Sequence, residues 1–378
     1  YIVELQLLNT ASIQPRLILH ITSNTWIRDS HGLFDYESKQ LEATYIVEPQ
    51  DSYLVRVNSR VLTTQDLSQY STGGDCSLLA RIKPVPEGYL LEPLDNGEAV
   101  WLITRELGDA GFEISSGDVL KLGRLQFLAH LDDVPDSCSS VSTHTESSEE
   151  PMQLDEEMAR ECRICFADVE EAANPMISPC SCTGSMKYIH YSCLKHWLET
   201  RMTARVQDNF RYFLWKSLDC ELCKEPLPLN YTTENGAIFP LCVADKGDAP
   251  SIVLETLSKD RSSSRVVTAI AINQNCSVKL GRGHESDVRI PDISVSRCHA
   301  QLYNRDGKFY VADCNSKFGT LVQIRDPLYL RHNSHVSVQI GRSVLRFEVR
   351  SSDYTPKAQS DEALDEEQQD DLSFSSSA

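Results

Sequence analysis

Eight potential metal ligands fall into four pairs within one short stretch of this chain. The pairs are Cys162 with Cys165, Cys180 with Cys182, His190 with Cys193, and Cys220 with Cys223. Because two donors separated by one or two residues can turn toward the same ion, each pair supplies half of a tetrahedral site. Eight donors fill two four-coordinate Zn²⁺ sites and leave no position open for water, so both sites are structural. The four half-sites can combine in sequence or interleaved, and the spacing alone does not choose.

The order of the ligands resembles two zinc modules, the RING-CH class of ubiquitin ligases and the PHD finger that reads histone tails. Seven residues separate Cys182 from His190, where a PHD finger usually has four or five. Trp197 follows a ligand by four residues, whereas a PHD finger carries its Trp just before the last cysteine pair. The run Cys-Thr-Gly-Ser-Met-Lys-Tyr-Ile-His, residues 182–190, is similar to the RING-CH consensus. This segment is therefore identified as a member of the RING-CH class.

The RING-CH resemblance implies a cross-braced fold around two zinc ions. The first and third pairs would hold one ion, and the second and fourth pairs the other. These sets are Cys162, Cys165, His190 and Cys193, and Cys180, Cys182, Cys220 and Cys223. Interleaving ties distant segments together, which a module with so small an apolar core needs.

The same resemblance implies an E3 ubiquitin ligase that forms no covalent intermediate. Such a module binds a ubiquitin-conjugating enzyme and holds its ubiquitin thioester in a reactive pose, so that it catalyses by positioning. The implied contacts with the conjugating enzyme are Ile164, Trp197, Leu222 and Pro226, and Lys224 stands where many RING domains contact ubiquitin. For Ile164 and Trp197 the alternative is a place in the small core. The aromatic run 210–215 is predicted to be core or a partner groove.

A second segment, residues 251–350, is predicted to be a β-sandwich or barrel. Short strand-favouring runs alternate with polar turns, at residues 266–272, 277–280, 298–303, 308–312, 335–340 and 344–349. The segment carries fifteen Lys and Arg against nine Asp and Glu, a net charge of +6, although the whole chain has a net charge of −19. This local charge favours an acidic or phosphorylated partner.

Three blocks in this segment resemble the forkhead-associated (FHA) domain, a β-sandwich that binds phosphothreonine. They are Gly281-Arg282, Ser296-Arg297-Cys298-His299 and Gly319-Thr320. The resemblance implies that Arg282 and Ser296 contact the phosphate, the first by charge-assisted hydrogen bonds. Arg297 and Lys317 are expected to add contacts beside them, and His299 to brace the binding loop.

One position departs from the FHA pattern. Phe318 precedes the Gly-Thr pair, where the family usually has an Asn that holds the backbone of the bound peptide. Two interpretations follow. The sandwich has a working phosphopeptide site with an altered sequence preference, or it has only a structural role. The presence of Arg282 and Ser296 favours the working site.

Residues 1–131 are predicted to form a second, degenerate FHA-like β domain. The sequence of residues 113–127 resembles that of residues 330–347, and residues 88–94 can be aligned with residues 308–314. The runs 44–47 and 53–57 also favour strands. No Gly-Arg followed by Ser-x-x-His appears in register, so phosphate binding is not expected there.

Most of the negative charge lies in two segments between and after these units. Residues 132–161 have a net charge of −9 and residues 351–378 a net charge of −7, and both are poor in large apolar side chains. This composition is typical of disorder. The predicted organisation is therefore a β domain (1–131), an acidic linker (132–158), the RING-CH finger (159–230), a connector (231–250), the FHA domain (251–350) and an acidic tail (351–378).

The rest of the sequence limits the cellular compartment in which the protein is expected and the partners that it is expected to bind. No apolar run approaches the roughly 18 residues that a membrane span needs, and thiolate ligands favour the reducing cytosol or nucleus. We predict a soluble, mainly β, multidomain E3 ligase whose partners are a conjugating enzyme, ubiquitin and a phosphorylated protein or its own phosphorylated linker. The alternative is a non-catalytic adaptor that reads protein tails and phosphopeptides. The overall charge disfavours nucleic acid.

Overall fold

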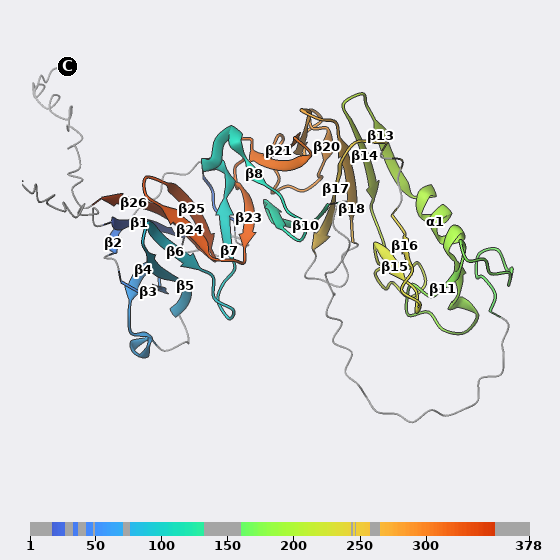
Figure 1. Cartoon of the computed structure of the whole chain (residues 1–378), viewed down its shortest axis with the longest axis horizontal. Helices are drawn as coiled ribbons and strands as arrows, with labels where there is room; N and C mark the ends of the chain where they lie inside the picture. The colour runs from blue at the N-terminus through green and yellow to red at the C-terminus, as the bar shows by residue number, and fades with distance from the viewer. Residues whose placement is uncertain are drawn as a thin grey trace, which may run out of the picture.

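The structure is a computed structural model of the chain (Figure 1), and it describes residues 17–26, 33–36, 43–47, 50–70, 76–131, 160–242, 245, 247–257 and 265–351. The predicted linker lies outside the described residues, as does the predicted tail after Ser351. The described part forms twenty-six β-strands, one α-helix and three 3₁₀ turns. The mainly β fold is therefore confirmed.

The strands follow the alternating apolar pattern of the sequence. Before the linker they are β1 (Leu17–Thr25), β2 (Ala43–Val47), β3 (Ser52–Val57), β4 (Arg60–Thr64), β5 (Cys76–Val85), β6 (Gly88–Glu92), β7 (Val100–Ile103), β8 (Phe112–Glu113), β9 (Val119–Leu122) and β10 (Leu125–Leu131). After the zinc ligands they are β17 (Ser251–Leu257), β18 (Val267–Ile272), β19 (Ser277–Gly281), β20 (Val288–Arg289), β21 (Ala300–Arg305), β22 (Lys308–Asp313), β23 (Thr320–Ile324), β24 (Leu328–Arg331), β25 (His335–Ile340) and β26 (Ser343–Ser351). All six runs predicted between residues 266 and 349 form strands.

The zinc module, residues 160–242, contains the only α-helix among the described residues. Its elements are β11 (Met176–Ile177), β12 (Ile189–His190), α1 (Tyr191–Thr200), β13 (Met202–Val206), β14 (Phe210–Trp215), β15 (Asn230–Thr232) and β16 (Ile238–Pro240). The helix buries Leu194 and Leu198, four residues apart on one face, in the core of the module.

The β-strands build two sandwiches that share one long sheet. A twelve-stranded sheet runs β13-β14-β18-β17-β10-β9-β23-β7-β25-β26-β1-β2. The sheet β20-β19-β21-β22-β8 covers its first part, which gives the C-terminal sandwich, and the sheet β24-β6-β5-β3-β4 covers its second part, which gives the N-terminal sandwich. The two sandwiches and the zinc module lie in a row (Figure 1).

The two sandwiches exchange their last strands. β8, β9 and β10 precede the linker in sequence, yet they pair with β22, β23 and β17 of the C-terminal sandwich. In return β24, β25 and β26 pair with β6, β7 and β1 of the N-terminal sandwich. Each of the units predicted at 1–131 and 251–350 therefore contains strands from the other. The runs 113–127 and 330–347, which resemble each other in sequence, lie in the two exchanged segments.

β14 joins the zinc module to the C-terminal sandwich. It pairs with β18 along its whole length, from Phe210 opposite Ile272 to Trp215 opposite Val267. Because side chains alternate along a strand, Phe210 and Tyr212 enter the core of the sandwich while Phe213 and Trp215 enter the core of the zinc module. The predicted aromatic run is thus core, and one strand serves two cores.

Candidate zinc centre and phosphopeptide site

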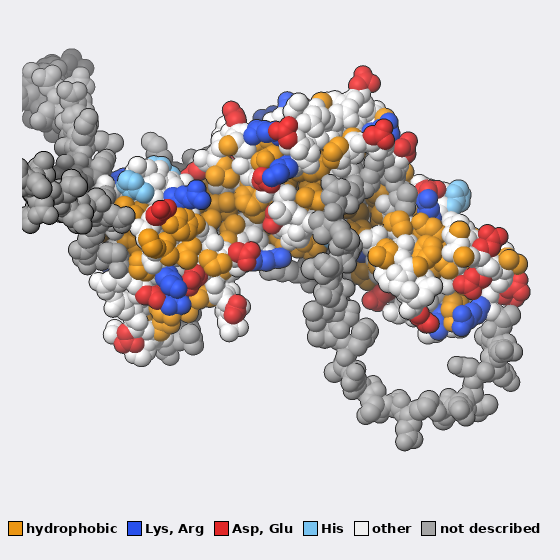
Figure 2. All heavy atoms as spheres, viewed as in Figure 1, with side chains coloured by type: hydrophobic (Ala, Val, Ile, Leu, Met, Phe, Trp, Pro, Cys, Tyr) orange, Lys and Arg blue, Asp and Glu red, His pale blue; other side chains and the backbone are white. Residues whose placement is uncertain are grey.

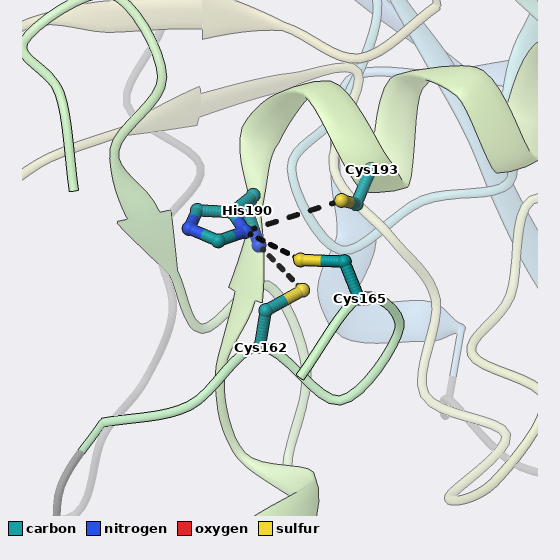
Figure 3. A group of neighbouring side chains, drawn as sticks. All are labelled: Cys162, Cys165, His190 and Cys193. Atoms are coloured by element: carbon teal, nitrogen blue, oxygen red, sulfur yellow. Dashed lines mark hydrogen bonds between the residues drawn. The ribbon is translucent and has the colours of Figure 1, made fainter. Parts of the chain in front are cut away.

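The first group of metal ligands comes together from a loop, a strand and a helix (Figure 3). Cys162 and Cys165 lie in a turn, His190 ends β12, and Cys193 lies in the first turn of α1. The ligand atoms of these four residues all lie within 4.8 Å of one another. This is the interleaved set that the RING-CH resemblance implies.

The hydrogen bonding of His190 leaves its Nδ1 free to bind a metal. Its Nε2 lies 2.8 Å from the backbone oxygen of Val169 and donates to it, so Nδ1 carries the lone pair. Nδ1 faces the thiols and lies 3.2 Å from Cys165 Sγ. A ligand His held by a carbonyl on its other nitrogen is the usual arrangement around zinc.

The second group consists of Cys180, Cys182, Cys220 and Cys223, whose sulfur atoms also lie within 4.8 Å of one another. Cys182 Sγ and Cys220 Sγ are 3.7 Å apart. Zn–S bonds of about 2.3 Å at tetrahedral angles place neighbouring sulfurs about 3.8 Å apart. The two clusters therefore fit two zinc ions.

Backbone N–H groups stabilise the thiolate form of one cysteine in each cluster. Burial alone would raise the pKa of Cys162, but N–H groups of Cys165, His190 and Ile164 donate to its sulfur and lower the pKa to about 6. The pKa of Cys220 is likewise lowered to about 6, against the effect of burial, by N–H groups of its own loop. These two sulfurs are therefore thiolates near neutral pH, the form that binds zinc.

Arg163 lies between Cys162 and Cys165 in the sequence, and its side chain reaches the second cluster. Its guanidinium lies 3.6 Å from Cys180 Sγ and 3.7 Å from Cys220 Sγ, and it donates to the backbone oxygen of Met186 at 2.9 Å. Four thiolates around one Zn²⁺ carry a net charge of −2, which this cation partly offsets. The sequence did not single out Arg163, because nothing in its local pattern marks it as a neighbour of the second cluster.

The predicted contacts with a conjugating enzyme are mostly exposed. The exposed fraction is 42% for Ile164 and 58% for Leu222, one on each zinc loop, and Pro226 is also exposed. Trp197 is half-buried against the core of the module, with the Arg201 guanidinium 4.4 Å from its ring centre. Apolar side chains are visible on the zinc module (Figure 2).

Three further apolar side chains on the zinc loops are exposed although the sequence reasoning did not select them. They are Phe166, Val169 and Met186. Lys224 is exposed and has a φ of +62°, at the end of the last zinc loop. Arg201 forms an ion pair with Glu221, which joins the end of α1 to that loop. These three residues are isolated apolar positions in polar loops, and no local pattern in the sequence shows that they are exposed.

The predicted phosphate contacts gather at one end of the C-terminal sandwich. Arg282 follows β19, Ser296 and Arg297 precede β21, and Lys317 precedes β23. The Lys317 N–H donates to Ser296 Oγ at 3.0 Å, which brings two of the loops together. The side chains of Arg282 and Arg297 are exposed and form no ion pair with another described residue. The end of the sandwich therefore presents cations to solvent.

His299 braces these loops from below. Ser296 N–H donates to His299 Nδ1 at 2.9 Å, so the ring proton lies on Nε2, which donates to the Gly319 oxygen at 3.1 Å. Burial lowers the pKa of His299, which keeps the ring neutral so that Nδ1 can accept. The ring holds the loop bearing Ser296 against the loop bearing Lys317.

Two domain models match these two sites. Residues 162–223 match the RING-variant domain, and residues 278–341 match the FHA domain. The chain carries a RING-variant (RING-CH) domain and an FHA domain. The exchange of strands means that the FHA match extends into β24 and β25, which are part of the N-terminal sandwich.

Relatives align with the RING-variant domain. The mouse protein named E3 ubiquitin-protein ligase MARCHF7 is 42% identical over 76 residues, 20% of this chain and 10% of that protein. The human protein named probable E3 ubiquitin-protein ligase MARCHF10 is 36% identical over 66 residues, 18% and 7% of the two chains. The Xenopus tropicalis protein named E3 ubiquitin-protein ligase MARCHF8 is 32% identical over 90 residues, 24% and 26%. The matches therefore cover between 7% and 26% of the length of these relatives.

Arg56, on β3 of the N-terminal sandwich, makes its contacts within the protein. Arg56 is buried and ion-paired with Glu98. It also donates to the oxygen of Ile340 and to Ser77 Oγ. The charge of Arg56 is therefore neutralised within the protein.

Among the described residues, no helix has both the length and the apolar character needed to cross a bilayer.

Proposed function

We propose that this protein is an E3 ubiquitin ligase whose RING-variant domain recruits a charged conjugating enzyme and whose FHA domain recruits a phosphorylated partner. The observation that carries the proposal is the pair of exposed apolar side chains, Ile164 and Leu222, on the two loops that the zinc clusters hold. Apolar anchors on a rigid scaffold are what a protein-binding hot spot needs. The names of the aligned relatives support the same activity.

The residues of the zinc module would act by binding and orienting. Ile164, Leu222 and Pro226 would pack on the conjugating enzyme, with the exposed part of Trp197 beside them. Lys224 would contact ubiquitin by a point charge, because an ammonium lacks the bidentate fork of Arg. The two zinc ions hold the loops rigid, so the contribution to rate is positional.

Substitution of the apolar loop residues tests the ligase activity. We expect Ile164→Ala and Leu222→Ala each to lower ubiquitin-chain formation at least about tenfold, as loss of a hot-spot side chain does, while the protein keeps two zinc ions. The assay is ATP-dependent autoubiquitination of the full chain with a panel of conjugating enzymes. Val206→Ala is the matched control, because Val206 has an exposed fraction of 63% but lies on β13.

Two results would count against this assignment. Chain formation that is unchanged in both loop variants would place the working surface elsewhere. A wild-type protein with two bound zinc ions that forms no chains with any conjugating enzyme would favour the adaptor function.

The FHA domain would bind phosphothreonine through Arg282, Ser296, Arg297 and Lys317. A phosphate with a charge of about −1.5 to −2 gains charge-assisted hydrogen bonds from exposed guanidinium groups. Phe318 would replace the backbone contact of the usual Asn by an apolar surface. The ligand would be a phosphorylated substrate or the chain's own phosphorylated linker.

Removal of the Arg282 guanidinium tests this binding. We expect Arg282→Gln to weaken phosphothreonine-peptide binding about tenfold or more, since a charged hydrogen bond contributes about 1.5–3 kcal/mol. Isothermal titration or fluorescence anisotropy measures it. Arg305→Gln is the control, because Arg305 is an exposed arginine at the turn between β21 and β22, the opposite end of the sandwich. Equal affinity of wild type and Arg282→Gln would contradict the proposed site.

The shared strand would fix the two binding surfaces relative to each other. β14 contributes to both cores, and Arg205, on the preceding strand, donates to the oxygen of Asp287 at 3.1 Å, near the loop that follows Arg282. A phosphorylated partner would thus be held at a defined distance from the conjugating enzyme.

A further inference from the structure

Arg163 has its backbone in the first zinc cluster and its guanidinium at the second. It lies between the ligands Cys162 and Cys165. Its backbone N–H donates to the oxygen of Tyr188 at 3.0 Å, and the ligand His190 follows Tyr188 by two residues. Zinc in the first cluster would hold the residues on both sides of Arg163 in one turn. The position of the Arg163 backbone therefore depends on the first cluster.

The side chain of Arg163 contacts one ligand from each pair of the second cluster. Nη1 lies 3.6 Å from Cys180 Sγ, and Nη2 lies 3.7 Å from Cys220 Sγ. Nη1 also donates to the oxygen of Met186 at 2.9 Å, which holds the guanidinium in this orientation. The side chain is half-buried, so solvent screens these contacts less than it screens contacts between exposed charges.

The charge of the loaded clusters gives the sign of the effect. Four thiolates and Zn²⁺ carry a net charge of −2, whereas three thiolates, a neutral imidazole and Zn²⁺ carry −1. Zinc binding releases the protons that remain on the sulfur atoms. A hydrogen bond to an ionised acceptor is about twice as strong as one to a neutral acceptor. The guanidinium therefore favours the zinc-loaded form of the second cluster over its zinc-free form.

We propose that Arg163 couples the two zinc centres: zinc in the first cluster fixes the turn that carries Arg163, and the guanidinium then stabilises the zinc-bound thiolates of Cys180 and Cys220. Coupling between two binding sites is reciprocal, so zinc in the second cluster also tightens the binding of zinc in the first. The coupling favours chains that hold both ions over chains that hold one. It does not depend on ligase activity.

Withdrawal of metal from the loaded full chain measures the support that Arg163 gives to the second cluster. Co²⁺ in place of Zn²⁺ reports each cluster separately, because a Cys₄ site and a Cys₃His site differ in their ligand-field bands. In Arg163→Met we expect the affinity of the second cluster to fall about 10- to 100-fold, the usual cost of losing a group that supports a metal ligand. A species with metal only in the first cluster should accumulate to a larger fraction than in wild type.

A double-mutant cycle tests the coupling itself. Cys165→Ala removes a ligand of the first cluster and leaves the four sulfur atoms of the second. If the first cluster positions Arg163, then Arg163→Met should lower the Co²⁺ affinity of the second cluster by less than about threefold in the Cys165→Ala background, because the guanidinium is already out of place. Equal costs in both backgrounds would mean that Arg163 supports the second cluster without help from the first, and the coupling would be wrong.

Two further variants separate the guanidinium from general stability. Arg163→Lys keeps the charge but lacks the planar fork that reaches two sulfur atoms, so its second-cluster affinity should lie between those of wild type and Arg163→Met. Arg201→Gln is the matched control. Arg201 pairs with Glu221 in the second-cluster loop, but the pair is partly exposed and involves no ligand atom. Both affinities should stay within about threefold of wild type.

Alkylation of the loaded chain with iodoacetamide gives a readout at single cysteines. A hydrogen bond withdraws electron density from a thiolate and lowers its nucleophilicity. In Arg163→Met, peptide mass spectrometry should therefore find faster alkylation at Cys180 and Cys220 than in wild type, with less change at Cys182 and Cys223. Unchanged second-cluster affinity in Arg163→Met would overturn the proposal. So would an equal loss at both clusters with uniformly faster alkylation, which would indicate a loss of general stability.

Discussion

Cys220→Ser is expected to unfold the zinc module and also to loosen the C-terminal sandwich. Cys220 is a buried ligand of the second cluster, and structural zinc contributes about 10 kcal/mol or more to the folding of such modules. β14 depends on the module for one of its faces and supplies Phe210 and Tyr212 to the sandwich with the other. Burial of two large aromatic side chains is worth about 3–6 kcal/mol, so much of this stabilisation should be lost from the sandwich.

Zinc content and hydrogen exchange measure the two effects together. We expect bound zinc to fall from two ions per chain to one or none, and amides of β18, which pair with β14, to exchange much faster. Cys76→Ser is the control, since Cys76 is a cysteine of β5 outside both clusters. Loss of zinc with undisturbed exchange in β18 would mean that β14 stays in place without the module.

Phe127→Ala is expected to destabilise the C-terminal sandwich, although Phe127 lies before the linker in the sequence. Phe127 is 5% exposed and packs in the core of that sandwich. Truncation of a buried Phe to Ala costs about 3–5 kcal/mol. Exchange should therefore accelerate in β19, β21 and β22, and phosphopeptide binding should weaken.

The reciprocal variant is the matched control for the strand exchange. Phe347 is a buried Phe on β26, near the C-terminal end of the described residues, and it packs in the core of the N-terminal sandwich. Phe347→Ala should accelerate exchange in β3, β5 and β6 and affect β19, β21 and β22 far less. If each variant instead loosens strands of its own half of the sequence, the hairpins are not exchanged.

Local patterns in the sequence predicted the strands at 44–47 and 53–57, the six strands between residues 266 and 349, and the metal ligands. Strand runs such as 335–340 could be found because apolar and polar side chains alternate with a period of two. The zinc pairs could be found because both donors of a pair lie within four residues of each other. Spacing left the combination of pairs open, and the geometry around His190 and Cys220 gives the interleaved one.

Features that depend on contacts between distant residues could not be found in this way. Arg163 beside Cys220, Glu98 beside Arg56 and Asp35 beside Lys317 join residues that no local period relates. The exposed Phe166 was also missed, because exposure of one loop residue is decided by what packs around it.

The sequence by itself determined which clearly alternating runs form strands and which residues can hold two zinc ions, because both depend on spacing or alternation over a few residues. Only the tertiary structure decided which sandwich receives which hairpin. The runs 113–127 and 330–347 resemble each other, and an alternating pattern specifies the face that a strand buries but not the partner against which it is buried. The same holds for β14. Apolar side chains on both of its faces predict that both faces are buried, but only the packed structure shows that one face lies against the zinc module and the other against the FHA sandwich.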